Sequence, residues 1–93
     1  MKLRLSRQFS DELAEIVDFI ALDNVQRAIK FYDALIAQIE KIPDNPYQCR
    51  QRASTNNPHI RELIFKHYVI VFEIKTDHIN LLGIFNQNQW HQK

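Results

Sequence analysis

Three apolar runs in the last third of the chain constrain its fold more than any other feature. They lie between Ile60 and Phe85 and are separated only by Lys66-His67 and by Lys75-Thr76-Asp77. A parallel crossover needs about a dozen residues or more, whereas an antiparallel hairpin needs only about two to five. The segment is therefore predicted to form three consecutive antiparallel strands, each paired with the next.

Apolar residues recur at helical spacing ahead of these strands. They are Leu13, Ile16, Val17 and Ile20, followed by Ala28, Phe31, Tyr32, Leu35, Ile39 and Ile42. Ser10 is a suitable N-cap for the first helix, and Asn24 can cap the second. Pro43 ends the second helix because proline lacks an N–H and disfavours helical geometry in the residue before it. The connection is short, so residues 10–42 are predicted to form an antiparallel helical hairpin with a shared core.

A short alternating segment from Lys2 to Ser6 is predicted to form a further strand. The segment Tyr68–Ile74 is apolar on both sides near its middle, as in a central strand with both faces covered. The helices cover one face, and a partner chain is a candidate cover for part of the other. The predicted fold class is α+β, in the order β-α-α-β-β-β, with the hairpin packed on a mainly antiparallel four-stranded sheet. Residues 47–59 are predicted to form one long loop, and residues 1–93 are predicted to form a single domain.

Two local features of the predicted strands need an explanation. Gly83 is the only glycine and falls inside the last strand, where it is consistent with a bulge, a close backbone approach or a small packing position. The turn at Lys66 and His67 contains no glycine, although two-residue hairpin turns often need positive φ. We therefore expect either strain at His67 or a longer loop.

The charges nearly balance, since 12 Lys and Arg face 11 Asp and Glu, for a net charge of +1. This argues against strong nucleic-acid binding driven by counterion release, and no direct sequence-specific contact with nucleic acid is expected. The distribution is uneven, however, because residues 11–23 contain five acids and no Lys or Arg. The basic residues of the segment 50–66 are Arg50, Arg52, Arg61 and Lys66, opposed only by Glu62. The pattern indicates either an ordinary solvated surface or an acidic helix face with a basic sheet edge.

Cys49 is the only cysteine, so no internal disulfide can form, which fits a reducing compartment. No motif surrounds it, and we expect a bystander thiol. The four histidines lack the spacing of a metal site, and the chain has neither a phosphate loop nor a hydrolase serine motif. No metal or cofactor is expected. The sequence shows no signal-peptide pattern and no run of 18 apolar residues, which predicts a cytoplasmic protein without membrane contact.

Three segments carry a resemblance to a known superfamily. They are Ser10-Asp11-Glu12-Leu13, the stretch from Asn24 to Pro46 with its exit Ile42-Pro43-Asp44-Asn45-Pro46, and the string from Ile60 to Ile74. In order and spacing they resemble the ParE/RelE superfamily of bacterial toxins from type II toxin–antitoxin pairs, over nearly the whole chain. The last string is similar to the ParE pattern of a basic-led strand, a tight turn with Tyr and an aromatic strand.

The two branches of the superfamily imply different activities. RelE-like members cut messenger RNA on the ribosome, and commonly place an Arg after the turn aromatic, where this chain has Val69. ParE-like members resemble the chain better, and this resemblance implies inhibition of DNA gyrase by binding. ParE relatives often end the last strand with a His-Gln-Arg-Gln-like string, whereas Asn86 and Asn88 stand at its first and third positions here. An attenuated toxin that only binds its antitoxin is a further alternative.

The resemblance implies a cognate antitoxin as partner, and DNA gyrase as target, or the ribosome in the RelE-like alternative. The candidate target- or antitoxin-binding residues are Arg50, Arg52, Arg61, Lys66, His67, Tyr68, Asn86, Gln87, Gln89 and Trp90. If the chain is a nuclease, the candidate catalytic residues are Arg61, His67 and His91. The structural alternatives are an edge ion pair for Arg61, a core position for Tyr68 and packing against the body for Trp90.

Antitoxin binding is expected on the outer grooves of the hairpin and on uncovered apolar sheet surface, where a disordered segment can fold as it binds. The acidic first helix suits basic antitoxin residues. Apolar surface of this kind seldom stays exposed, so the free toxin is also expected to form a homodimer.

Overall fold

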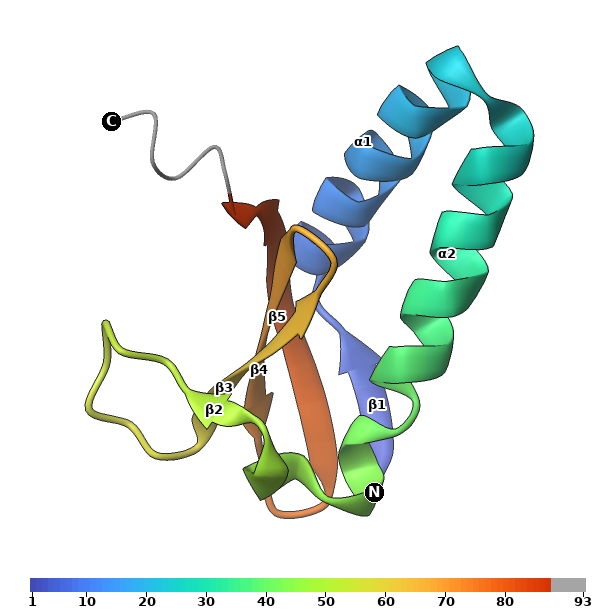
Figure 1. Cartoon of the computed structure of the whole chain (residues 1–93). Helices are drawn as coiled ribbons and strands as arrows, with labels where there is room; N and C mark the ends of the chain where they lie inside the picture. Colours follow the sequence, from blue (N-terminus) through green and yellow to red (C-terminus); the bar gives the residue numbers. More distant parts are fainter. Residues whose placement is uncertain (88–93) are drawn as a thin grey trace.

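The structure is a computed structural model that describes residues 1–87 (Figure 1). Its regular elements are β1 (Lys2–Leu5), α1 (Arg7–Asp23), α2 (Val25–Ile39), β2 (Arg50–Gln51), β3 (Ile60–Phe65), β4 (Tyr68–Ile74) and β5 (His78–Asn86). Two short 3₁₀ turns, η1 (Ile42–Asp44) and η2 (Pro46–Gln48), link α2 to β2. The α+β class and the order of the predicted elements are confirmed.

The five strands form one sheet in the order β1-β5-β4-β3-β2. β1 runs parallel to β5, and all other neighbouring strands are antiparallel. The predicted three-strand meander is confirmed, and β4 is its central strand. The count of four strands was wrong, because Arg50 and Gln51 pair with Glu62 and Arg61 inside the segment predicted to be a loop. Two residues are too few to show the alternation that identifies a strand.

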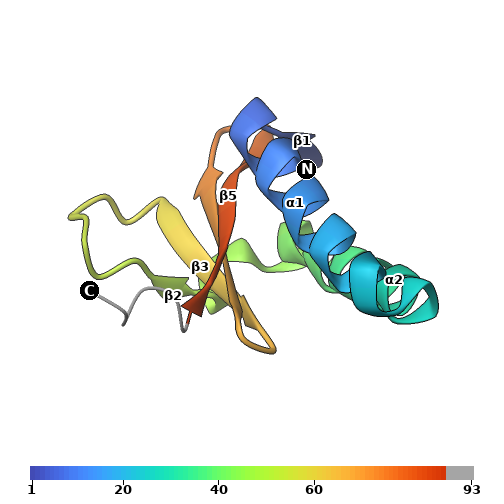
Figure 2. The same cartoon turned by 90° about the horizontal axis from the view of Figure 1, so that it is seen from above.

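The helical hairpin covers one face of the sheet, as Figures 1 and 2 show from two directions. Alternate strand residues point toward it, since side chains on a strand alternate between faces. The buried core consists of Phe9, Leu13, Phe31, Leu35, Ile39, Ile42, Ile70, Phe72, Ile74, Ile79, Leu81 and Ile84. Ile16, Val17 and Ile20 pack against this core, so the predicted stripe of the first helix is confirmed. Tyr32 was wrongly placed in the stripe of the second helix, because its side chain is exposed.

The helix boundaries differ from the predicted ones in two places. α1 begins at Arg7, and its N-cap is Ser6 rather than Ser10. The Ser6 hydroxyl accepts a hydrogen bond from the Phe9 N–H at 3.0 Å and donates one to the Leu82 carbonyl at 3.2 Å. α2 ends at Ile39, before Pro43 can stop it, and the chain continues into η1. The predicted Asn24 cap is confirmed, since its side chain accepts from the Arg27 N–H at 3.0 Å.

Gly83 lies beside a β-bulge in β5. Val71 pairs with Gly83 while Phe72 pairs with Leu81, so the ladder skips Leu82. The Leu82 carbonyl is held by Ser6, and the Ile84 N–H donates to the Glu12 carboxylate at 2.9 Å. A Cβ atom at Gly83 would lie 2.9 Å from Glu12 Oε1. The glycine therefore lies at a bulge and also leaves room for a close neighbour. That neighbour is the Glu12 side chain and not a backbone segment.

The β3–β4 turn has positive φ at Lys66, at 55°. The expectation of strain at His67 was wrong, because no other non-glycine residue in the part of the chain described here has positive φ. Phe65 pairs with Tyr68 across the turn, so the loop has only two residues and the expected alternative of a longer loop was wrong as well.

Replacing Glu12 by Ala should lower the free energy of unfolding by about 1–3 kcal/mol, because the part-buried Ile84 N–H loses its acceptor. Glu12→Gln should retain most of the stability, since an amide oxygen also accepts. Urea unfolding monitored by circular dichroism measures both variants. Glu15→Ala, at an exposed position on the same helix, is the matched control. Equal stability of wild type and Glu12→Ala would contradict this role.

Candidate functional site

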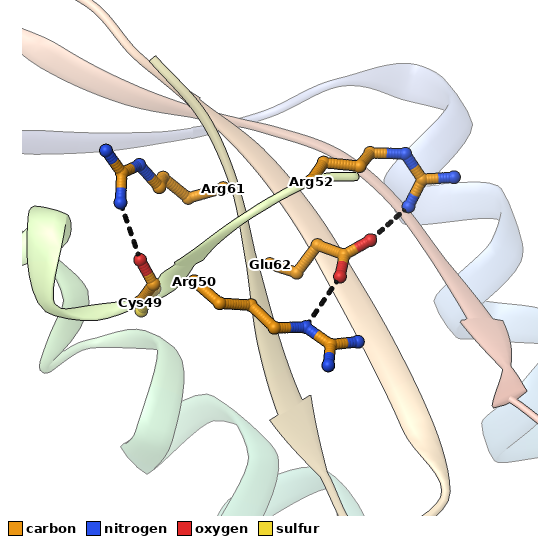
Figure 3. A network of polar contacts seen from close by, with 5 residues as sticks. All are labelled: Cys49, Arg50, Arg52, Arg61 and Glu62. Atoms are coloured by element: carbon orange, nitrogen blue, oxygen red, sulfur yellow. Dashed lines mark hydrogen bonds and ion pairs between the residues drawn. The ribbon is translucent and has the colours of Figure 1, made fainter. Parts of the chain in front are cut away.

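The predicted basic residues do not form one continuous surface. Arg61 and Glu62 are neighbours on β3, so their side chains point to opposite faces of the sheet. Figure 3 shows Arg50 and Arg52 turned toward Glu62, while Arg61 points the other way, toward Cys49. The structure therefore divides the arginines into two groups, each with its own contacts.

Arg50 and Arg52 share one carboxylate on the face of the sheet opposite the helices. Arg50 Nε lies 2.9 Å from one Glu62 oxygen, and Arg52 Nη1 lies 2.5 Å from the other. Glu62 is only 8% exposed, so both ion pairs are shielded from solvent on the carboxylate side. The Arg52 guanidinium also lies 5.5 Å from the centre of the Phe85 ring. One of these two positive charges is thus neutralised within the protein.

A shallow hollow of about 360 Å³ adjoins this cluster. Arg50, Arg52 and Ser54 line one part of it, and Phe85 and Gln87 line another. The hollow combines one excess positive charge with hydrogen-bonding groups and an aromatic ring. Arg50, Arg52 and Gln87, three of the candidate binding residues, therefore lie together.

Arg61 stabilises the loop that precedes β3 through hydrogen bonds to its main chain. Its Nε donates to the Pro58 carbonyl at 2.8 Å, and its Nη1 donates to the Cys49 carbonyl at 3.0 Å. Its guanidinium stacks over the Tyr47 ring at 5.1 Å, and the Tyr47 hydroxyl bonds His59 Nδ1 at 2.8 Å. The expected alternative of an edge pair with a carboxylate was wrong, because the partners of Arg61 are main-chain carbonyls.

The β3–β4 turn carries the next candidate residues. Lys66 and His67 are exposed, and the Lys66 ammonium lies 5.5 Å from the centre of the Phe65 ring. Tyr68 is half-buried and contacts Phe31 edge-on at 5.3 Å, which is the predicted core position. The Gln87 N–H donates to the His67 carbonyl at 2.7 Å, and this bond ties the end of β5 to the turn.

Asn86 is the last residue of β5 and pairs with Tyr68. Gln89, Trp90 and His91 lie outside the described residues, so their predicted roles stay predictions. Arg61 is the second residue of β3, whereas His67 lies in the turn that follows this strand, about 20 Å away by strand geometry. The structure does not bring these two candidate nuclease residues together.

Sequence reasoning did not identify the exposed apolar side chains of the hairpin. Phe19 is 74% exposed and Leu22 is 86% exposed near the end of α1, and Val25, Ile29 and Tyr32 are exposed on α2. The sequence does contain a signal for this surface. Four large apolar residues of the hairpin lie outside the two core stripes, namely Phe19, Leu22, Val25 and Ile29. Exposed apolar groups gathered in this way mark an interaction surface more often than chance.

An acidic cleft of about 660 Å³ lies between α1 and the end of β5. Glu12, Glu15 and Asp18 contribute carboxylates to its lining. Its apolar lining is Ile16, Phe19, Leu22, Tyr68, Ile84 and Phe85. The acidic face predicted for the first helix therefore lies next to apolar surface. A segment with basic residues beside an apolar stripe could bind such a cleft, because it would contact both the carboxylates and the apolar side chains.

Reactive groups are not prominent in the described part of the chain. Burial raises the pKa of the Cys49 thiol, although the nearby Arg61 charge opposes the shift, so the thiol is neutral and weakly reactive at pH 7. Within residues 1–87, no three His, Cys, Asp or Glu side chains gather as metal ligands. In the same residues, no helix is long and apolar enough to cross a membrane.

The fold and these surfaces define a small α+β protein whose prominent sites are suited to binding other proteins. The chain belongs to the ParE toxin family of type II toxin–antitoxin systems, parDE, whose family model matches residues 3–89. A structure of a chromosomal ParDE toxin–antitoxin system from P. aeruginosa has the same fold, with a TM-score of 0.75 and 22% identity. The alignment covers 92% of this chain and 95% of that chain. No curated protein sequence matches the chain significantly.

Replacing Glu62 by Ala should lower the free energy of unfolding by about 2 kcal/mol, because Arg50 and Arg52 lose their shared carboxylate. Glu73→Ala is the matched control, since it removes only the more exposed pair with Lys75 and should cost less than about 1 kcal/mol. Chemical denaturation measures both. If the two variants lost equal stability, the shielded cluster would have no special structural role.

Proposed function

We propose that this ParE-family toxin acts in the cytoplasm by binding DNA gyrase and inhibiting it, and that a cognate antitoxin neutralises it. The observation that carries the proposal is the combination of family membership with several large apolar side chains that are exposed on the hairpin in the described part of the chain. The described residues also bring together no evident nucleophile and base, since Arg61 is bound to loop carbonyls and His67 lies in the turn beyond the far end of β3. Binding, rather than bond cleavage, is the chemistry that these surfaces support.

The antitoxin is proposed to occupy the acidic cleft beside α1. The cleft offers the Phe19 and Leu22 side chains for apolar contact and the carboxylates of Glu15 and Asp18 for cations. A helix with one apolar stripe and Lys or Arg beside it would satisfy both requirements. The P. aeruginosa structure is described as a ParDE toxin–antitoxin system, and such a pairing supports an antitoxin partner for this chain.

The gyrase surface is proposed to include the hollow opposite the helices, where Arg50, Arg52 and Gln87 lie together. Arg61 is better assigned to loop positioning, because its nitrogen atoms already donate to main-chain carbonyls. Asn86 replaces the His of the ParE-like terminal string, so the attenuated toxin remains the second candidate for this chain.

Gyrase inhibition predicts that the purified chain abolishes supercoiling of relaxed plasmid by DNA gyrase in the presence of ATP. Adding the protein encoded by the neighbouring reading frame should restore supercoiling. Heat-unfolded chain is the control. Undisturbed supercoiling together with cleaved transcripts soon after induction would favour the ribosome-dependent nuclease instead. Harmless overexpression with retained complex formation would favour the attenuated toxin.

The proposed antitoxin site predicts that Leu22→Glu weakens antitoxin binding at least about tenfold, because a charge enters a desolvated apolar contact beside existing carboxylates. Isothermal titration calorimetry with the protein encoded by the neighbouring reading frame measures the change. Ile64→Glu is the matched control, since Ile64 is an exposed apolar residue on β3, away from the cleft. Equal affinities of wild type and Leu22→Glu would place the antitoxin elsewhere.

A further inference from the structure

A second apolar stripe runs along the outer side of α2. It consists of Val25, Ile29, Tyr32 and Ile36, and the first three are 60%, 50% and 44% exposed. The core-facing stripe of the same helix, Ala28, Phe31, Leu35 and Ile39, is buried. α2 is therefore apolar on two adjacent faces. Ile36 is half-buried and also packs against the core, whereas Val25, Ile29 and Tyr32 remain exposed within residues 1–87.

The spacing of the outer stripe is that of a coiled-coil seam. Its members are separated by four, three and four residues, which is the alternation of the a and d positions in heptads. The same spacing is obtained when the stripe is read from either end. Two copies of α2 in antiparallel orientation would therefore place Val25 of each copy against Ile36 of the other, and Ile29 against Tyr32. A self-complementary surface of this kind suits a two-fold interface.

The charges beside the stripe fit the same arrangement. Gln26, Lys30 and Asp33 are exposed and follow one edge of it. In the described residues, neither Lys30 nor Asp33 has an ion-pair partner. In the antiparallel pairing, Asp33 of one copy lies opposite Gln26 and Lys30 of the other. Each carboxylate then meets a donor and a cation, and the two-fold symmetry repeats this contact.

We propose that the free protein forms a two-fold homodimer through α2, with the outer stripe as its seam. α2 has 15 residues and is about 22 Å long, so the contact falls at the small end of specific interfaces. The dimer is accordingly weak and dissociates on dilution into the micromolar range. This interface is separate from the acidic cleft beside α1 and does not depend on the identity of the target.

Sedimentation velocity of the purified chain tests this proposal over about 5 to 500 μM. The wild type should shift from monomer to dimer as concentration rises, and Ile29→Glu should remain a monomer throughout. Leu22→Glu, at an exposed residue of α1 outside the stripe, should dimerise like the wild type. A monomeric wild type at the highest concentration, or unchanged dimerisation of Ile29→Glu, would overturn the proposal. Far-ultraviolet circular dichroism confirms that each variant is folded.

A charge exchange tests the antiparallel geometry separately. Asp33→Lys should weaken the dimer at least about tenfold, because it places two cations against each other across the seam. The double variant Lys30→Asp, Asp33→Lys should recover most of the affinity, since the opposite charges face each other again. Failure of the double variant to recover affinity, in a protein that retains its helical content, would exclude this register.

Discussion

The attachment of the first turns of α1 to β5 is the interaction on which the rest of the arrangement depends. The bulge at Gly83 frees main-chain groups at the point where β1 no longer flanks β5, and Ser6 and Glu12 bind two of them. The same contacts fix where α1 leaves the sheet. Because α2 follows after a single residue, the direction of the whole hairpin is set by a few hydrogen bonds to one strand.

The arginines show that a count of charges overstates the positive surface of this protein. Arg61 is engaged by carbonyl groups, and Glu62 neutralises one of the two charges on Arg50 and Arg52. The acidic side chains of α1, in contrast, remain available beside apolar groups. The hairpin thus offers two distinct apolar surfaces, one acidic cleft and one self-complementary stripe, and the sheet contributes a smaller polar hollow.

Periodicity predicted the helices and the meander because their apolar faces are set by local geometry. The features it missed depend on distant contacts. The sequence pattern favoured Ser10 as the N-cap of the first helix, whereas Ser6 is the N-cap and its hydroxyl also donates to the Leu82 carbonyl, 76 residues away. Tyr32 has helical spacing with the core residues but lies on the adjacent face of α2. The alternation of side chains along a strand predicts to which face of the sheet Arg61 points. The carbonyl groups that Arg61 binds could not be predicted, because their positions depend on how the loop folds.

The position of β5 has a consequence for synthesis. This strand follows every other described element along the chain, yet it lies between β1 and β4. During translation, β1 has no neighbour until residues 78–81 leave the ribosomal exit tunnel, and α1 has no strand on which to anchor. The first strand of the chain therefore cannot take its final place in the sheet until the last described strand has been synthesised and has emerged from the ribosome.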